Sequence, residues 1–173
     1  MRDAVNSVGR VDPDMPRRIL VAYDESPQAQ AALEHALTGF PDAELVVLHV
    51  NNPSEWVYGD SMGAYYSEDA FEQARESGER LLAGAEATAG EHDRTVETVL
   101  ETGQTSGTIV DYAEEHGIDH VVIGSHGRTG LSRFLLGSVA ERVARRSPTS
   151  VTIIREADAT EEQVSESDTA TTS

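Results

Sequence analysis

The chain has 173 residues, a length typical of a single domain with its own hydrophobic core. Its 31 acidic and 13 basic residues give a formal net charge of −18 at pH 7, every basic residue is arginine, and cysteine is absent. This composition excludes disulfides, cysteine catalysis and a lysine-dependent phosphate loop, and it argues against binding to nucleic acid or to an anionic membrane.

Charge and hydropathy predict a cytoplasmic protein. No apolar run approaches the roughly 20 residues that a membrane-spanning helix needs, and the first residues lack the apolar core of a signal peptide. Strong negative charge destabilises a compact fold at low salt through self-repulsion, which salt screens. We therefore hypothesise a salt-loving host.

Apolar runs typical of strands alternate with helical patterns along the chain. The predicted strands cover residues 18–23, 44–50, 95–101, 119–124 and 149–155. This alternation predicts an α/β fold: one open, doubly wound, mainly parallel five-stranded sheet with helices on both faces. Residues 1–16 have little apolar periodicity and residues 156–173 carry six acids and no base, so both are predicted to be disordered tails around a domain of residues 17–155.

Four helices are predicted between the strands. Ser26 before Pro27 marks the start of the first helix, and Gly39 marks its end. Apolar residues at intervals of three and four from Phe71 to Ala85 predict a second, longer helix. The third covers about residues 105–115, and the fourth runs from near residue 138 to before residue 148. The loop of residues 51–66 contains four aromatic residues, which favours packing against the body, with a lid as the alternative.

A glycine-rich segment follows the fourth predicted strand. Its residues are Gly124, Ser125, His126, Gly127, Arg128, Thr129 and Gly130, and the next helix opens at Gly137 and Ser138. Glycines let the backbone approach a phosphate, and a helix start offers unpaired N–H groups with the positive end of the helix dipole. The segment therefore predicts an anion site. The alternative is a turn shaped by glycines, followed by a capping box of Ser138 and Glu141.

The spacing of the glycines identifies a family resemblance. There is no G-x-x-x-x-G-K-[ST] motif and no G-x-G-x-x-G after the first strand. The spacing G-x2-G-x9-G-S from Gly124 to Ser138 instead resembles the ATP-binding signature of the universal stress protein family. The resemblance extends over residues 17–155 and includes Asp24 at the end of the first strand and residues 48–50 at the end of the second.

The resemblance implies a sheet of strand order 3-2-1-4-5 and a site for ATP or AMP, with Mg²⁺ or Mn²⁺ held by the phosphates. It also implies a homodimer in which edge strands 149–155 pair antiparallel. The nucleotide-binding residues that it implies are Ala22, Asp24, Val50, Gly124, Ser125, His126, Gly127, Arg128, Thr129, Gly130, Gly137, Ser138, Val139 and Ala140.

Other residue patterns suggest chemistry less strongly. Asp24 at a strand end fits ligand binding better than catalysis or metal binding. His116 and His120 have a metal-ligand spacing, but Gly117 breaks the helix that this spacing requires. Ser125 and His126 suggest a hydrolase, although adjacent side chains rarely meet and no G-x-S-x-G elbow is present. His49 ends a buried strand, and we predict that it is a hydrogen-bonded wall residue and not a ligand.

The sequence therefore predicts a regulatory or stress-protective nucleotide-binding protein with little or no turnover. The alternatives are a dimeric scaffold of the same fold that binds no nucleotide, and a weak ATPase. From Ser125 to Ser147 the chain carries five arginines and one acid, so Arg128 and Arg133 are expected to reach the phosphates.

Overall fold

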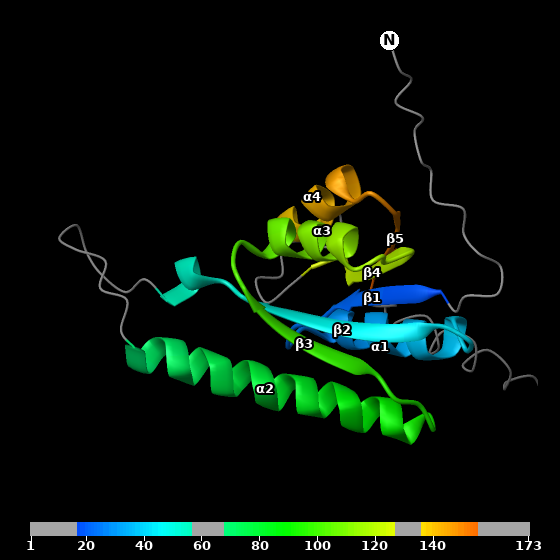
Figure 1. Cartoon of the computed structure of the whole chain (residues 1–173), viewed down its shortest axis with the longest axis horizontal. Coiled ribbons are helices and arrows are strands. Elements are labelled where there is room, and N and C mark those ends of the chain that lie inside the picture. Colours follow the sequence, from blue (N-terminus) through cyan, green and yellow to red (C-terminus); the bar gives the residue numbers. More distant parts are fainter. Residues whose placement is uncertain (1–16, 57–67, 127–135, 156–173) are drawn as a thin grey trace, which may run out of the picture.

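The computed structural model describes residues 17–56, 68–126 and 136–155 (Figure 1). The elements are β1 (Arg18–Ala22), α1 (Pro27–Gly39), β2 (Glu44–Asn51), the 3-10 helix η1 (Pro53–Trp56), α2 (Glu68–Glu91), β3 (Glu97–Thr102), α3 (Thr105–Glu115), β4 (His120–Gly124), α4 (Ser138–Arg146) and β5 (Ser150–Ile154). The predicted tails, residues 1–16 and 156–173, and most of the aromatic loop lie outside the described residues, so these predictions stay open.

The five strands form one parallel sheet in the order β3-β2-β1-β4-β5. The predicted fold class and strand order are therefore confirmed. The order reverses direction between β1 and β4, and in an open parallel sheet the crevice outside the carboxyl ends at such a point is where ligands bind. Each helix that follows a strand starts near this edge.

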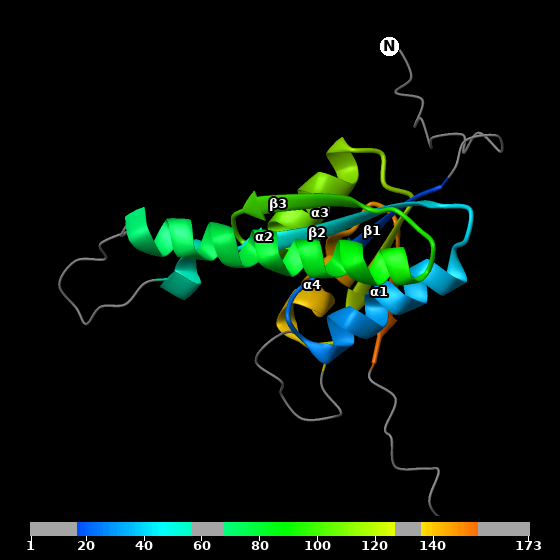
Figure 2. The ribbon, with the colours of Figure 1, turned by 90° about the horizontal axis from the view of Figure 1, so that it is seen from below.

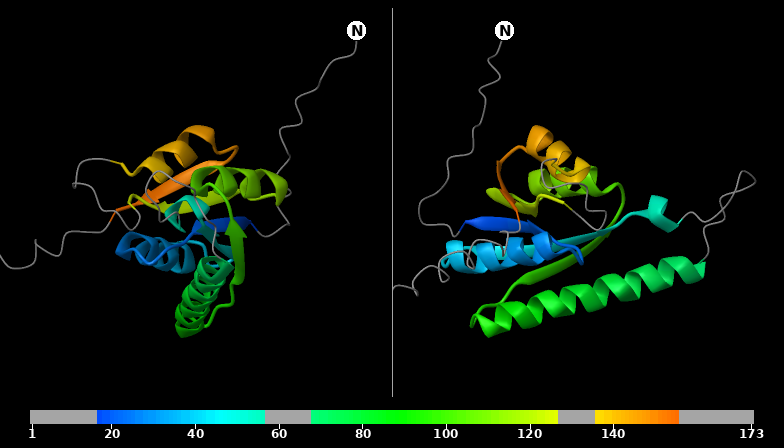
Figure 3. Two further views of the ribbon diagram at one scale, coloured as in Figure 1. Left: turned by 90° about the vertical axis from the view of Figure 1, so that its left-hand side faces the viewer. Right: turned by 180° about the vertical axis from the view of Figure 1, so that it is seen from behind.

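Two helical layers cover the sheet, α1 and α2 on one face and α3 and α4 on the other (Figures 2 and 3). Side chains alternate between the faces because the strand period is two. On β1, Ile19 and Val21 belong to the core under α1 and α2, whereas Leu20 and Ala22 belong to the core under α3 and α4. Burial on both faces explains why the central strands β1, β2 and β4 are mainly apolar, whereas the edge strand β3 carries Glu97, Thr98, Glu101 and Thr102.

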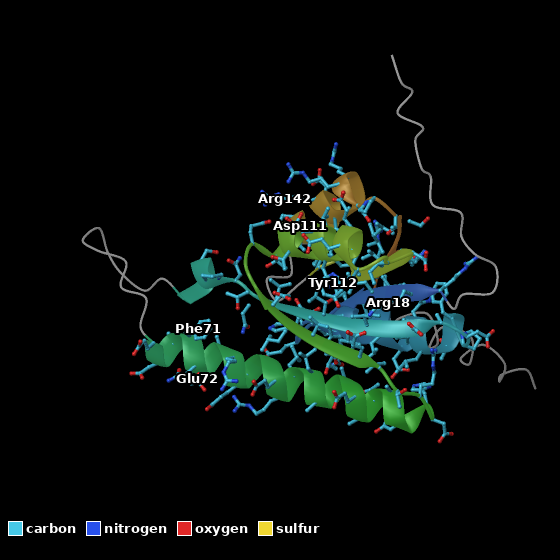
Figure 4. All side chains as sticks on the ribbon, in the orientation of Figure 1. Arg18, Phe71, Glu72, Asp111, Tyr112 and Arg142 are labelled. Carbon is cyan, nitrogen blue, oxygen red and sulfur yellow. The ribbon has the colours of Figure 1, made fainter. Side chains whose placement is uncertain are left out.

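The amino ends of the strands are tied together by Arg18 (Figure 4). Its guanidinium donates to Glu97 Oε2 of β3 at 2.6 Å and to the carbonyl of His116 at 2.9 Å, and it lies 3.7 Å from Glu44 Oε2 of β2. Its backbone N–H donates to Asp119 Oδ2 just before β4, at 2.8 Å. A single residue of β1 thus connects to β2, to β3 and to the approach to β4.

Arg94 and His120 make further contacts between neighbouring elements. Arg94 donates to three backbone carbonyls around the end of α1, which belong to Leu37, Phe40 and Ala43. His120, the first residue of β4, contacts the ring of Phe40 and hydrogen bonds through Nε2 to Thr152 Oγ1 of β5 at 2.7 Å. Burial lowers the pKa of His120, and the nearby His35 and Arg17 lower it further.

The predicted element boundaries differ from the observed ones mainly at α2 and β3. Helix α2 extends from Glu68 to Glu91, and the first buried residue along it is Gly78. Phe71, predicted as part of the apolar stripe, is 47% exposed. Figure 1 shows these first turns of α2 projecting past the sheet. Strand β3 begins at Glu97, two residues later than predicted.

Candidate functional site

A cavity of about 750 Å³ lies at the carboxyl edge of the sheet. It is bounded by the ends of β1, β2 and β4, by the first turns of α1, α3 and α4, and by the first half of α2. This size falls within the range of small-molecule sites. The lining residues are Ala22, Tyr23, Asp24, Glu25, Ser26, Ala29, Leu48, His49, Val50, Asn51, Asn52, Ala70, Gln73, Ala74, Ser77, Leu81, Thr105, Ile109, Ile123, Gly124, Ser125, His126, Gly137, Ser138, Val139 and Ala140.

The turn after β1 is held by its own polar residues. Asp24 Oδ1 accepts from the backbone N–H of Ser26 at 2.9 Å and also from the Ser26 hydroxyl. Ser26 Oγ in turn accepts from the N–H of Ala29 at 3.2 Å and so caps α1, as predicted. The carboxylate of Asp24 is thereby fixed at the cavity wall, and part of its hydrogen-bonding capacity serves the turn.

Gly124 and Gly137 allow close packing around the end of β4. A Cβ on Gly124 would lie 2.9 Å from the backbone carbon of Gln28 in α1, and a Cβ on Gly137 would lie 2.9 Å from the carbonyl oxygen of Ser125. The N–H of Gly137 donates to that same carbonyl at 2.8 Å. The two glycines therefore bring the starts of α1 and α4 against the end of β4.

The start of α4 presents unused hydrogen-bond donors to the cavity. Gly137 is the N-cap residue and provides no side-chain cap, and the first hydrogen bond of the helix runs from the N–H of Glu141 to the carbonyl of Gly137. Within the part of the chain that the structure describes, the N–H groups of Ser138, Val139 and Ala140 have no partner. The capping box considered for Ser138 and Glu141 is wrong: Ser138 is the first helical residue, and Glu141 pairs with Arg145 at 3.0 Å.

Ser125 and His126 do meet, contrary to the expectation for adjacent side chains. Ser125 Oγ and His126 Nδ1 are 3.1 Å apart. Ser125 is buried, and its backbone N–H donates to the carbonyl of Ile154 in β5 at 2.7 Å. His126 Nε2 is buried and has no hydrogen-bond partner among the described residues.

His49 and Tyr23 form the wall of the cavity on the α2 face. His49 is 7% exposed, and its Nδ1 lies 2.8 Å from the carbonyl oxygen of Tyr23. A carbonyl only accepts, so Nδ1 carries the proton. The expected hydrogen-bonded role of His49 is thus confirmed, and the residue also lines the cavity. Burial, followed by Asp24 and Glu34, raises the pKa of Tyr23, which keeps its phenol protonated.

Ten of the fourteen predicted site residues line this one cavity. They come from four separate segments of the chain, residues 22–24, 50, 124–126 and 137–140, which the fold brings together. Gly127, Arg128, Thr129 and Gly130 lie outside the described residues, as does Arg133. The described arginines of α4, Arg142 among them (Figure 4), do not line the cavity, whose charged lining residues in the described ranges are Asp24 and Glu25.

Sequence reasoning missed the α2 side of the cavity. Gln73, Ala74 and Ser77 face the cavity, although the apolar period through α2 predicted a helix packed on the sheet. The signal that could have located this side is the uncharged character of residues 70, 73, 74 and 77 beside charged neighbours.

The described ranges contain neither a cluster of metal-binding side chains nor a membrane-spanning helix. No group of three or more His, Cys, Asp or Glu side chains that could hold a metal occurs there. His116 instead stacks on Tyr112, with ring centroids 3.8 Å apart (Figure 4 labels Tyr112). Residues 17–56, 68–126 and 136–155 include no helix with the length and apolar character to cross a membrane.

The fold, the glycine spacing and the cavity define a protein of the universal stress protein class. The model of the universal stress protein family matches residues 15–155, so the chain belongs to this family. The chain is 31% identical over 148 residues to universal stress protein YxiE of Bacillus subtilis, a match that covers 82% of this chain and 100% of that protein.

Solved structures agree with this assignment. Protein MJ0577 of Methanocaldococcus jannaschii matches with a TM-score of 0.65 and 26% identity, over 84% of this chain and 99% of that one. More distant likenesses show the fold alone. A universal stress protein in complex with cAMP matches at 24% identity (TM-score 0.60; 80% and 96% covered), and a family protein of Arabidopsis thaliana with AMP bound matches at 18% identity (TM-score 0.59; 83% and 94% covered).

Proposed function

We propose that this chain binds an adenine nucleotide, ATP or AMP, in the cavity and acts as a regulatory or stress-protective protein with little or no turnover. The observation that carries the proposal is the start of α4, where Ser138, Val139 and Ala140 line the cavity and their N–H groups have no partner in the described structure. A helix start with free donors and a positive dipole end is suited to a phosphate.

The packing glycines support this role for α4. Because Gly137 lies against the carbonyl of Ser125, the first turn of α4 sits directly beside the end of β4. A phosphate chain bound at Ser138 would then contact the loop after β4, where Gly127 to Gly130 are proposed to complete the cradle. The same fold holds AMP in the Arabidopsis protein and cAMP in another universal stress protein.

The apolar part of the cavity lining suits a nucleoside. Ala22, Leu48 and Ile123 provide apolar walls on the α3 and α4 face of the sheet. We place the adenine against the backbone of Val50 and the ribose near Asp24, whose carboxylate is held in place by Ser26. An apolar pocket with a few fixed polar groups is the usual form of a small-molecule site.

The acidic residues that line the cavity affect how ATP and its metal ion would bind. Asp24 and Glu25 would repel the phosphates of ATP, and the described lining contributes no cation. Mg²⁺ or Mn²⁺ bound to the phosphates would reduce this repulsion from Asp24 and Glu25.

The proposal is tested by deleting a single N–H donor. Ser138→Pro removes the N–H at the first helical position, where no intrahelical hydrogen bond is lost. Gly137 already has φ −61° and ψ 149°, which suits the residue before proline. We expect ATP affinity, measured by calorimetry, to fall at least tenfold, about 1.4 kcal/mol, while the unfolding midpoint stays nearly unchanged.

Ser138→Ala is the matched control, since it removes the hydroxyl and keeps the N–H. Equal ATP binding by the original chain and a folded Ser138→Pro variant would refute the phosphate site. Identifying small molecules released by heating the purified protein shows which adenine nucleotide it carries.

Slow ATP hydrolysis is a second candidate, favoured by the contact between Ser125 and His126. Both residues line the cavity next to the proposed phosphate site. Phosphate release from ATP, compared with that of a Ser125→Ala variant, decides between the two. Release at the same low rate from both proteins would rule out a catalytic role for this pair.

The family resemblance and the composition carry three further proposals. A homodimer would form by antiparallel pairing of the edge strand β5, whose apolar edge needs a partner or a cover. Light scattering in molar salt is expected to give twice the chain mass, and a folded monomer would contradict the homodimer.

The net charge of −18 supports a salt-loving host and a place in the cytoplasm. The free energy of unfolding should then rise with salt concentration.

A further inference from the structure

The cavity continues beyond the proposed nucleotide position, onto the other face of the sheet. Leu48, Val50 and Ile109 line it on the α3 and α4 face, whereas Tyr23 and His49 line it on the α1 and α2 face. We call the part on the latter face, bounded by Tyr23, His49, Ala70, Gln73, Ala74 and Ser77, the α2 lobe. Val50 and the start of α4 line the same continuous cavity on the other face of the sheet.

The first half of α2 lies along this lobe without packing on the sheet. Ala70, Ala74 and Ser77 are half-buried, and Gly78 is the first buried residue of the helix. The residues of this half that line the cavity are all uncharged, although a quarter of the whole chain is charged. The charged residues lie elsewhere on the helix, where Arg75 pairs with Glu72 at 2.6 Å and with Glu79 at 2.7 Å.

His49 supplies a directed polar atom in the same lobe. Its Nδ1–H donates to the carbonyl of Tyr23, so Nε2 of the neutral ring is an acceptor. Nε2 has no hydrogen-bond partner among described residues, and its side of the ring faces α2, because a Cβ on Gly78 would lie 3.2 Å from the neighbouring Cδ2 atom. A residue that is only 7% exposed thus turns an unused acceptor toward the lobe.

We propose that the α2 lobe is a second ligand site, for a small uncharged molecule that carries an N–H or O–H donor on an apolar ring. The donor would meet His49 Nε2, and the ring would lie against Ala74 and the neighbouring turns of α2. An uncharged lining in so acidic a chain disfavours an ionic ligand, because no described residue of the lobe offers a counter-charge. The site is independent of the nucleotide and can be tested whether or not ATP binds.

The test uses indole and 1-methylindole, a pair that differs in the N–H donor. Calorimetry on the whole chain, with and without saturating ATP, is expected to show indole binding about tenfold more tightly than 1-methylindole. His49→Phe keeps an aromatic ring and removes the acceptor, so the difference between the two probes should vanish. In ¹⁵N spectra of the histidine rings, indole should shift the Nε2 signal of His49.

Ala74→Leu fills the lobe and should abolish the binding of both probes, and Ala83→Leu on the exposed side of the same helix is the matched control. If His49→Phe does not fold, the comparison of Ala74→Leu with Ala83→Leu still shows whether the probes bind in the α2 lobe. Equal affinity of the original chain for both probes, unchanged binding by Ala74→Leu, or displacement of indole by ATP would each overturn a separate second site.

Discussion

Replacing Gly137 by alanine tests whether close packing at the start of α4 is what builds the site. The backbone of Gly137 has φ −61° and ψ 149°, which alanine adopts without strain, so the effect is purely steric. The added Cβ would lie 2.9 Å from the carbonyl oxygen of Ser125 and 3.3 Å from the Cα of His126. Both neighbours are backbone atoms, so α4 must move by several tenths of an ångström.

The expected cost follows from this geometry. An extra methyl in a tightly packed place destabilises by about 1–3 kcal/mol. The same shift stretches the hydrogen bond from the N–H of Gly137 to Ser125, now 2.8 Å, and moves the three free N–H groups. We expect the free energy of unfolding to fall by that amount and ATP affinity to fall about tenfold. Denaturant titration and calorimetry at one fixed salt concentration measure the two effects.

Gly84→Ala provides a control of opposite sign. No atom lies within 4 Å of a Cβ on Gly84, which is exposed in the middle of α2. Alanine there should raise stability by about 0.5–1 kcal/mol because it improves helix propensity, and it should leave ATP binding unchanged. The reasoning fails if Gly137→Ala is as stable as the original chain, or if both variants change stability in the same direction.

The remaining predictions concern other contacts described above. Arg94→Lys cannot reproduce the contacts of the guanidinium with three carbonyls and should cost about 1–3 kcal/mol of unfolding free energy in denaturant titration; no loss would refute that role. Ser26→Ala removes the cap of α1 and should cost about 1 kcal/mol in the same assay. Burial, His35 and Arg17 lower the pKa of His120 in the folded state, so the unfolded chain binds the proton more readily and stability should fall as pH drops through about 6.5. His120→Phe should show a smaller fall over that pH range, and an identical pH profile would contradict this account.

The fold was predictable from the sequence because local and tertiary signals agree. Thr105–Glu115 was predicted as a helix at its observed bounds, where Gln104 caps the start and Gly117, at φ +61°, follows the end. The central strands β1, β2 and β4 were recognisable because parallel strands that are buried on both faces read as continuous apolar runs. At α2 the apolar period predicted the helix correctly, but it wrongly predicted that Phe71 packs on the sheet. The spacing of apolar residues does not show how far a helix projects past its sheet.

The site was predictable only in part, for a different reason. Gly124 and Gly137 were read as close-approach positions for phosphate, and the structure adds helix packing against β4, which depends on Gln28 and Ser125. The contact between Ser125 and His126 depends on how the chain leaves β4, and sequence spacing does not encode that direction. The place of His49 in the cavity could not be foreseen, because it depends on the position of α2.

The contacts of Arg18 lie at one end of the strands, and the cavity lies at the other. Its partners on β2, β3 and the approach to β4 all lie at the amino ends of the strands, on the opposite edge from every residue of the cavity. The edge that secures the strands therefore shares no residue with the edge that meets ligands. Substitutions in the cavity can alter ligand preference while this anchor persists, and such separation makes a scaffold evolvable.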